Sequence, residues 1–283
     1  MQYKYDVSII VPFYNGNKYM DDLLSMVQKN VINSNLKVEL IIVNDSPDIN
    51  VKLSKKENYD VHIIYNKKNM GIHYSRVQGI KYALGQYVIM LDQDDVLYEN
   101  ALSSQYRCIK ENDIVISNGE DENPINKGMI YRSHKHQDCV LNEKYYYILG
   151  NMIVSPGQCL IKKEAIPQLW LKHSIKNNGC DDFMLWIMMF YEKKSITNNY
   201  EITYKHTYNG QNVSADFNKM KKSSIEMMTY LRKHDIISKE NEKIYMNRLK
   251  MREMYEGKSK IKKLLASLRF PKIAIELYKL KKM

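Results

Sequence analysis

Short apolar runs alternate with helix-like patterns along the first 120 residues of this 283-residue chain. Uninterrupted apolar runs are typical of parallel strands buried on both faces, whereas apolar residues three and four positions apart indicate a helix with one buried face. The expected strands cover residues 6–13, 38–44, 61–65, 87–91 and 113–117. The expected helices cover residues 18–30, 72–84 and 100–110, with a short turn at Gly85 before the fourth strand.

This alternation predicts an α/β fold in which a mostly parallel, Rossmann-like sheet is flanked by helices on both faces. Ligands bind such sheets beyond the carboxyl ends of the strands. Polar residues follow four of the expected strands at that edge: Tyr14 and Asn15, Asp45, residues 66–69, and residues 92–95. We therefore expect one binding site there, built from all four strand ends.

The rest of the chain divides into a less regular middle and a helical tail. In the middle we expect a polar loop at residues 118–128, a short strand at 159–161, a buried helix at 181–191 and a strand at 201–206. In the tail we expect helices at residues 225–233, 241–255 and 260–269, and a further helix after Pro271. The predicted organisation is a body of residues 1–215 and a helical, basic C-terminal extension of residues 216–283.

Charge is distributed unevenly between these two parts. Residues 216–283 contain 19 Lys and Arg against 8 Asp and Glu, an excess of 11 that equals the net charge of the whole chain, so the body is neutral. A neutral body argues against a nucleic-acid partner. In the tail, Ile261, Leu264, Leu265 and Leu268 form an apolar stripe among lysines, a pattern typical of a helix that lies on an anionic membrane surface. Packing onto the body or onto a second subunit, as in a homodimer, is the alternative.

The sequence lacks the patterns of a secreted or membrane-spanning protein. Its N-terminal apolar run is short and is followed by Pro12 and Asn15 rather than by a small-residue cleavage site. No window holds 18 uninterrupted apolar residues. The four cysteines form no Cys-x-x-Cys pair, which fits reduced thiols better than a zinc site or a disulfide framework. We expect a cytoplasmic protein, with its tail as a means of peripheral attachment to the inner face of the cell membrane.

Three carboxylates, Asp92, Asp94 and Asp95, crowd the end of the fourth expected strand. Because like charges repel, a divalent cation is the simplest compensation, and the hard cations Mg²⁺ and Mn²⁺ prefer oxygen ligands. The alternative is an acidic turn that caps the following helix.

Five other residues carry candidate chemistry, and each has a plainer alternative. Asp45 is suited to accept hydrogen bonds from a base edge or ribose, or to form an ordinary turn. Arg76 is suited to pair with a diphosphate, or to be a solvated helix residue. Asp181 and Asp182 could supply a general base, or simply favour the start of a helix. His206 could bind a metal, or be packed or solvated.

Five segments occur in a fixed order: VSIIVPFYN at 7–15, ELIIVNDS at 39–46, NMGIHYSRVQGIKYALGQYVIMLDQDD at 69–95, CDDFMLW at 180–186 and YKHTYNGQNVS at 204–214. Together they closely resemble the family 2 glycosyltransferases of the GT-A fold. The first three match in order and spacing over residues 6–98, and the two shorter ones extend the match to about residue 214. The Q-x-x-R-W block and membrane helices of the processive synthases are absent from the sequence, which favours transfer of a single sugar.

The resemblance implies a nucleotide-binding half, residues 1–117, and an acceptor half, residues 118–215. The expected nucleotide and diphosphate contacts are Pro12, Phe13, Tyr14, Asn15, Asp45, Asn69, Arg76, Asp92 and Gln93. Asp92 and Asp94 match the D-x-D motif of the family, with Asp94 expected to bind Mn²⁺ or Mg²⁺, Asp92 nearer the ribose, and His206 as a further metal or diphosphate contact. Asp182 matches the base that activates the acceptor, supported by Asp181, and residues 155–158 are expected to line the sugar subsites.

The same resemblance implies an inverting, metal-dependent enzyme of bacterial surface-polysaccharide synthesis. It would move one sugar from a nucleotide-sugar donor, a UDP-sugar by the habit of the family, to a glycan or a lipid-linked acceptor. Two other functions stay open. A sugar nucleotidyltransferase would use a Gly-rich, basic loop after the first strand, of which PFYNGNKY at 12–19 is a poor version. A non-catalytic module that binds a membrane surface or nucleic acid is the second.

Overall fold

The computed structural model describes residues 3–53, 57–124, 127–210, 216–256 and 259–283. Its strands are β1 (Tyr5–Phe13), β2 (Val38–Asn44), β3 (Asp60–Tyr65), β4 (Gly85–Met90), β5 (Val96–Leu97), β6 (Ile114–Asp121), β7 (Gly128–Met129), β8 (Cys159–Lys162) and β9 (Ile196–His206). Its helices are α1 (Met20–Ser34), α2 (Ile72–Tyr82), α3 (Ala101–Ile109), α4 (His134–Asp138), α5 (Glu143–Ile148), α6 (Gln168–Lys172), α7 (Asp181–Tyr191), α8 (Phe217–Lys233), α9 (Lys239–Glu256), α10 (Lys260–Arg269) and α11 (Pro271–Lys282). Residues 211–214 of the last matched segment, and residue 215 at the predicted body boundary, lie outside the described residues.

The described strands form one sheet in the order β3-β2-β1-β4-β8-β6-β9-β5, with β7 paired to β6. Strands β3, β2, β1 and β4 are parallel neighbours, so their carboxyl ends lie at one edge. Strand β8 lies antiparallel between β4 and β6, and β6 pairs in parallel with β9. The predicted α/β fold with helices flanking the sheet is confirmed.

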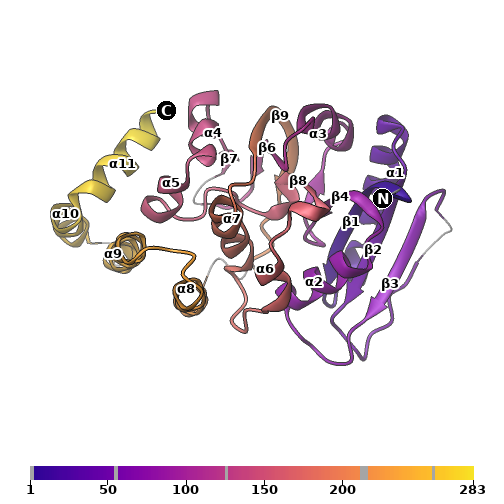
Figure 1. Cartoon of the computed structure of the whole chain (residues 1–283), viewed down its shortest axis with the longest axis horizontal. Coiled ribbons are helices and arrows are strands. Elements are labelled where there is room, and N and C mark those ends of the chain that lie inside the picture. The colour runs from indigo at the N-terminus through magenta and orange to yellow at the C-terminus, as the bar shows by residue number, and fades with distance from the viewer. Residues whose placement is uncertain (1–2, 54–56, 125–126, 211–215, 257–258) are drawn as a thin grey trace.

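Alternate residues of the central strands contribute to two separate cores. On one face of the sheet, Ile10 and Ile41 pack in a core that includes residues of α2 and α7. On the other face, Ile9 and Leu40 pack with residues of α1 and α3. Figure 1 shows α1 and α3 on one side of the sheet and α2 and α6 on the other. A strand that packs against a core on each face of the sheet must carry apolar side chains on both faces. This explains the uninterrupted apolar runs in the sequence.

Two glycines are required by close approach of the backbone to a neighbouring strand. A Cβ at Gly79 of α2 would collide with Ile10 of β1, so the glycine lets the helix lie close on the sheet. A Cβ at Gly85 would lie 2.7 Å from the backbone nitrogen of Ser8. The predicted turn at Gly85 is wrong: this residue begins β4 and pairs with Tyr5. A glycine in a sequence signals a tight backbone approach as readily as a turn.

The predicted polar loop at residues 118–128 is also wrong in its first part. Strand β6 continues to Asp121, and its polar end pairs with β9, from Asn118 opposite Ile202 to Asp121 opposite His206. Strand β9 begins at Ile196, earlier than its apolar pattern indicated. Backbone pairing with β9 holds this end of β6 in place although its side chains are polar. The pairing positions His206 beside the acidic end of β6.

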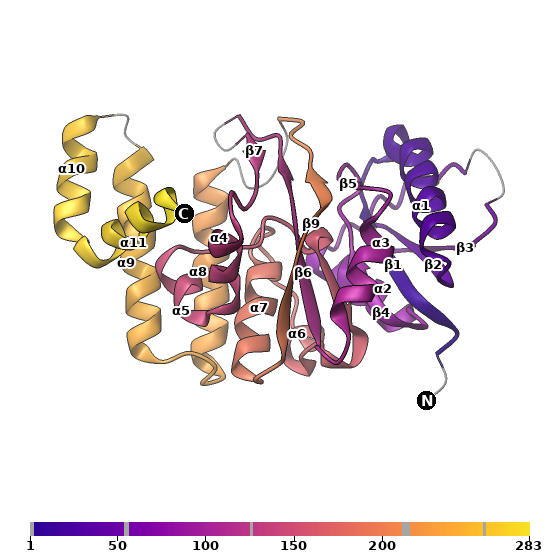
Figure 2. The same cartoon turned by 90° about the horizontal axis from the view of Figure 1, so that it is seen from above.

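The C-terminal helices form the end of the molecule opposite β3 (Figures 1 and 2). Helices α8 and α9 add Met227, Leu231, Tyr245 and Leu249 to the main core. Helices α10 and α11 form a small core of their own with the end of α9, around Phe270. In the part of the chain described, no helix is both long and apolar enough to cross a membrane.

Candidate active site

One cavity of about 550 Å³ opens where the parallel strands end. The residues predicted to act in catalysis, nucleotide binding or metal binding all line it: Pro12, Phe13, Tyr14, Asn15, Asp45, Asn69, Arg76, Asp92, Gln93, Asp94, Asp181, Asp182 and His206. These residues come from the ends of β1, β2, β4 and β9, from the loop before α2, from α2 itself, and from the start of α7. The fold thus brings together side chains that lie up to 194 positions apart in the sequence. Their individual roles remain predictions.

The end of β1 is locked to the acidic segment that follows β4. The backbone N–H of Tyr14 donates to the side-chain oxygen of Gln93 at 2.9 Å, and the Gln93 amide donates back to the Tyr14 carbonyl at 3.0 Å. Asn15 has a φ of +51°, a left-handed conformation that asparagine tolerates, and its N–H donates to the Ser46 hydroxyl. A side chain on Gly16 would collide with Gln93. This close contact fixes one wall of the cavity.

Asp45 organises the loop that leads into α2. Its carboxylate accepts hydrogen bonds from the Asn66 amide at 2.7 Å and from the backbone N–H groups of Met70 and Gly71, both at 2.8 Å. A carboxylate has about four lone-pair sites, so these bonds leave capacity for a ligand. The turn interpretation and the ligand interpretation of Asp45 are therefore compatible.

Arg76 is buried and is not the solvated helix residue that one interpretation expected. Its Nη2 donates to Asp92 at 2.6 Å and its Nη1 to Asp181 at 2.7 Å. Burial alone would lower the pKa of this guanidinium, but the charges of Asp181 and Asp92 outweigh it and raise the pKa. Arg76 consequently ties the end of β4 to the start of α7.

Asp181 and Asp182 are adjacent carboxyl groups with opposite pKa shifts. Burial would raise the pKa of Asp181, but the charge of Arg76 outweighs it and lowers that pKa. Burial and the charge of Asp181 raise the pKa of Asp182 to about 7, while Arg76 works in the other direction. The Asn151 amide donates to Asp182 at 2.8 Å. A carboxylate that titrates near neutral pH and lines a cavity is suited to general base catalysis.

Asp94 and His206 also line the cavity. Asp94 accepts a hydrogen bond from the Asn209 amide at 2.6 Å, and burial, with the charge of Asp92, raises its pKa. The His206 ring bonds Asp121 at 2.9 Å. Within the described ranges, no group of three or more His, Cys, Asp or Glu is arranged to hold a metal. One carboxylate and one imidazole fit a divalent cation that takes its remaining ligands from phosphate and water.

Asp95 differs from its two acidic neighbours because it does not line the cavity. It accepts hydrogen bonds from the Tyr204 hydroxyl and from the backbone N–H of Thr207 at 2.9 Å. Burial and the charge of Asp92 raise its pKa to about 8. Its contacts anchor the end of β9, so two of the three crowded carboxylates face the site.

Sequence reasoning missed Asn151 and Asn209, the amide partners of Asp182 and Asp94. No local pattern marks them, because each partner lies 31 or more positions away. Of residues 155–158, which were expected to line the sugar subsites, Ser155 and Pro156 line the cavity and Gly157 and Gln158 do not. The Ser155 hydroxyl lies 3.4 Å from Asp92.

Known proteins resemble this chain in part of its sequence and in its fold. Over 121 residues the chain is 36% identical to the minor teichoic acid biosynthesis protein GgaB of Bacillus subtilis, a match that covers 40% of this chain and 13% of that protein. Over 206 residues it is 27% identical to the poly(ribitol-phosphate) beta-N-acetylglucosaminyltransferase TarP of Staphylococcus aureus, covering 69% of this chain and 61% of TarP. The matches thus span less than two thirds of these relatives.

Two solved structures show the same fold at low sequence identity. Residues 1–349 of S. aureus TarS in complex with UDP-GlcNAc give a TM-score of 0.62 at 18% identity, covering 86% of this chain and 72% of that one. A mannosyltransferase of Pyrobaculum calidifontis in complex with GDP-Man and Mn²⁺ gives 0.56 at 12% identity, covering 98% and 82%.

The family comparison agrees with the resemblance seen in the sequence. Residues 8–170, more than half of the chain, match the family model of glycosyl transferase family 2. The matched span contains the ends of β1, β2 and β4 that line the cavity. The chain belongs to glycosyl transferase family 2.

Proposed function

We propose that the chain is an inverting, metal-dependent glycosyltransferase that moves one sugar from a nucleotide-sugar to a glycan or lipid-linked acceptor in surface-polysaccharide synthesis. The observation that carries the proposal is the position of Asp182, which has a pKa of about 7 and lines the same cavity as the strand-end residues of β1, β2 and β4. TarS bound to UDP-GlcNAc, and relatives named for teichoic acid biosynthesis and poly(ribitol-phosphate), support a UDP-sugar donor and a bacterial glycan acceptor.

The proposed nucleotide-binding half, residues 1–117, supplies the donor side of the cavity. Tyr14 and Asn15 lie at the end of β1, and Asp45 at the end of β2, where a base and ribose would bind. Asp94 and His206 would hold Mn²⁺ or Mg²⁺, which when bound neutralises charge on the departing nucleoside diphosphate. Arg76 holds the carboxylates of Asp92 and Asp181 in position through its two ion pairs, and its charge favours the ionised form of Asp181.

The proposed acceptor half, residues 118–215, supplies the base. Asp182 would take the proton of an acceptor hydroxyl as the hydroxyl oxygen attacks the anomeric carbon from the face opposite the leaving group, which inverts the configuration. Asn151 holds the Asp182 carboxyl in place through the 2.8 Å hydrogen bond. Asp181 cannot share this role readily, because its paired and buried carboxylate is a weak base.

The basic extension, residues 216–283, is proposed to bind the inner face of the cell membrane through α10. The side chains of its apolar stripe are exposed, with Ile261 at 70%, Leu264 at 62% and Leu268 at 69%. No described part of the body covers them, which favours the membrane interpretation over packing on the body. Lysines beside the stripe complement an anionic lipid surface, on which a lipid-linked acceptor would be presented. A homodimer through the same stripe is the competing occupant.

A donor screen tests the proposed reaction. Nucleotide-sugars are incubated with the full chain in Mn²⁺ or in EDTA. Release of nucleoside diphosphate is followed, with water taking the sugar in place of the acceptor hydroxyl. We expect one donor class to be consumed, and only with the metal. Formation of a nucleotide-sugar and pyrophosphate from a sugar phosphate and a nucleoside triphosphate would instead identify a sugar nucleotidyltransferase and contradict the proposal.

A further inference from the structure

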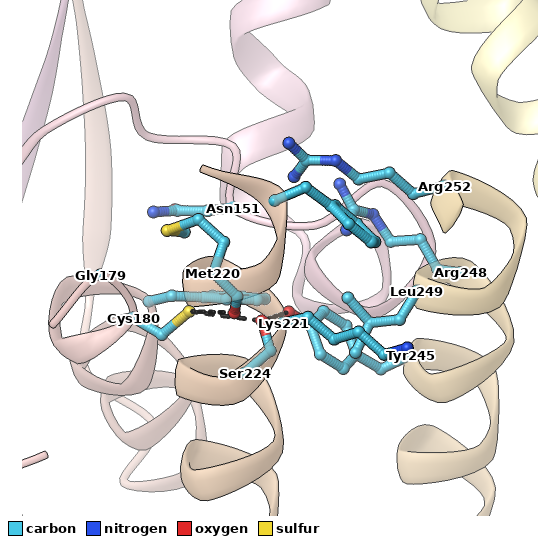
Figure 3. Close-up of a pocket in the computed structure, with 12 residues that line it drawn as sticks. Asn151, Gly179, Cys180, Met220, Lys221, Ser224, Tyr245, Arg248, Leu249 and Arg252 are labelled. Atoms are coloured by element: carbon cyan, nitrogen blue, oxygen red, sulfur yellow. Dashed lines mark hydrogen bonds between the residues drawn. The ribbon is translucent and has the colours of Figure 1, made fainter. Parts of the chain in front are cut away.

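A second cavity, of about 120 Å³, lies between the start of α7 and the helices α8 and α9 (Figure 3). Gly179 lines both this cavity and the larger one. Asn151 lines the small cavity and donates its side-chain hydrogen bond to Asp182. The small cavity therefore adjoins the proposed base, on the side of the C-terminal helices.

The small cavity is lined by three basic side chains, Arg248 and Arg252 of α9 and Lys221 of α8. Lys221 is paired with Glu253 at 2.7 Å, and Arg252 Nε lies 3.8 Å from Glu256. The guanidinium of Arg248 makes no hydrogen bond or ion pair with any residue that the structure describes. The cavity thus carries positive charge that the described residues do not balance.

Arg248 is held in place by packing rather than by a counter-ion. Its guanidinium lies 5.9 Å from the ring centre of Tyr245. Burial, and the neighbouring charge of Arg252, lower its pKa, yet an arginine stays charged at neutral pH. A partly buried charge without a partner is unfavourable, and an anion in the cavity would relieve that cost.

The turn at Gly150 connects the small cavity to the base. Gly150 has a φ of +92°, and a Cβ there would collide with the Arg248 guanidinium, so the guanidinium lies directly on the glycine backbone. The next residue, Asn151, holds Asp182. In Figure 3 the guanidinium groups of Arg248 and Arg252 lie on one side of the cavity and Asn151 on the other. The residue that Arg248 contacts, Gly150, is therefore the direct neighbour in the chain of the residue that positions the base.

We propose that this cavity is a subsite for a phosphate group of the acceptor, bound by Arg248 and Arg252, which places a hydroxyl of that acceptor near Asp182. Two guanidinium groups match the charge and the bidentate geometry of a phosphate oxyanion. The cavity has about a fifth of the volume of the larger one, room for a small charged group rather than for a second nucleotide. The assignment to the acceptor rests on the proposed function, whereas the anion site itself does not.

The test uses the full chain with its donor site saturated by UDP and Mn²⁺, so that added phosphate esters meet only the second site. Glycerol 3-phosphate and farnesyl diphosphate are titrated by calorimetry, one probing a soluble polyol phosphate and the other a prenyl-linked headgroup. We expect Arg248→Gln with Arg252→Gln to weaken binding of the better probe about tenfold or more, because charge-assisted hydrogen bonds are lost. The control, Lys243→Gln with Lys250→Gln, removes two exposed charges from the same helix and should bind as wild type does.

Equal binding of both probes by wild type and the arginine variant would overturn the proposal, as would tighter binding of glucuronate, a carboxylate of similar size. Because Arg248 packs on Tyr245, the single variants Arg248→Lys and Arg252→Gln are measured as well. Arg248→Lys keeps the charge and should retain part of the binding, and Arg252→Gln should lose part of it in a chain with an unchanged melting temperature. Failure of the proposed function shows separately, as absence of UDP binding. In that case phosphate binding that depends on the arginines still supports the anion site.

Discussion

The Nη1 atom of Arg76 lies 2.7 Å from the Oδ2 atom of Asp181, which joins α2 to the start of α7 across 105 positions of the sequence. Both side chains are buried. The other end of the guanidinium holds Asp92. This ion-pair network links the end of β4, on the proposed donor side of the cavity, to the helix that carries the proposed base, so a change in it should affect both stability and catalysis.

Replacement of Arg76 by glutamine should destabilise the fold strongly. The change leaves two carboxylates without their counter-charge, and breaking a buried pair typically costs about 3–5 kcal/mol. Urea denaturation measures this loss. The control is Arg107→Gln, which breaks an exposed pair with Glu201 and should change the stability little. Equal stability of the Arg76 variant and the control would show that the ion-pair network does not stabilise the fold.

Replacement of Asp182 by asparagine should abolish transfer while donor binding is kept. Asparagine has nearly the same shape but cannot accept a proton, and a general base contributes about 10²- to 10⁴-fold to a rate. Transfer is followed by product formation and donor binding by calorimetry. Asp22→Asn, at an exposed position of α1, serves as the control. Transfer at a near-normal rate in the Asp182 variant would show that another group is the base.

The pH dependence of kcat/KM should report the pKa of Asp182, which burial and the charge of Asp181 raise to about 7. The base works when it is deprotonated, so activity should be full above pH 7 and fall as pH decreases through 7. Arg76 and the Asn151 amide favour the ionised form. Asn151→Ala should therefore move the midpoint of the profile to higher pH. A midpoint that does not move would show that the Asn151 amide has no effect on the pKa of Asp182.

Replacement of Asp94 by alanine should remove the metal-dependent part of nucleotide binding. Calorimetry with UDP in Mn²⁺ and in EDTA separates that part from the rest. Wild type should bind much more tightly with Mn²⁺, and the Asp94 variant should bind equally weakly in both. Asp48→Ala, at an exposed position after β2, should behave as wild type does. Metal-dependent binding that survives in the Asp94 variant would place the metal elsewhere.

Loss of the exposed apolar stripe should release the chain from membranes. Leu264→Gln with Leu268→Gln should reduce flotation with vesicles that contain anionic lipid, because the stripe supplies the apolar contact. Ile32→Gln removes an apolar side chain of similar exposure from α1 and should float as wild type does. If both variants float equally and only the leucine variant loses self-association in sedimentation, the stripe is a dimer contact instead.

The helices and buried strands followed from the sequence where one residue pattern decides the structure. Strand β2 and helices α7 and α10 begin and end where their patterns predicted. In β2 and α7 apolar side chains enter a core along the whole element, and in α10 they form one stripe along the whole helix. The end of β6 was missed because backbone pairing with β9, not apolar side chains, holds Asn118 to Asp121. The position of β8 between β4 and β6 is likewise set by pairing at long range.

The candidate site was predicted in its membership but not in its internal bonds. Strand ends gave Asp45, Asp92 and Asp94, since parallel strands bring their carboxyl ends to one edge. The pairing of Arg76 with Asp181 could not be predicted, because the loops between them determine which side chains meet. The basic cavity at Arg248 was missed for the same reason: in the sequence this arginine is one of many cations on a helix.

The measurement that most directly tests the nucleotide-sugar site is a thermal-shift screen of nucleoside diphosphates, each with Mn²⁺ and with EDTA. A ligand that binds the folded state raises its melting temperature by mass action. Selective stabilisation by one nucleotide, UDP by expectation, that disappears in EDTA is the predicted result. A folded chain that no nucleoside diphosphate stabilises would contradict a metal-dependent nucleotide-sugar transferase.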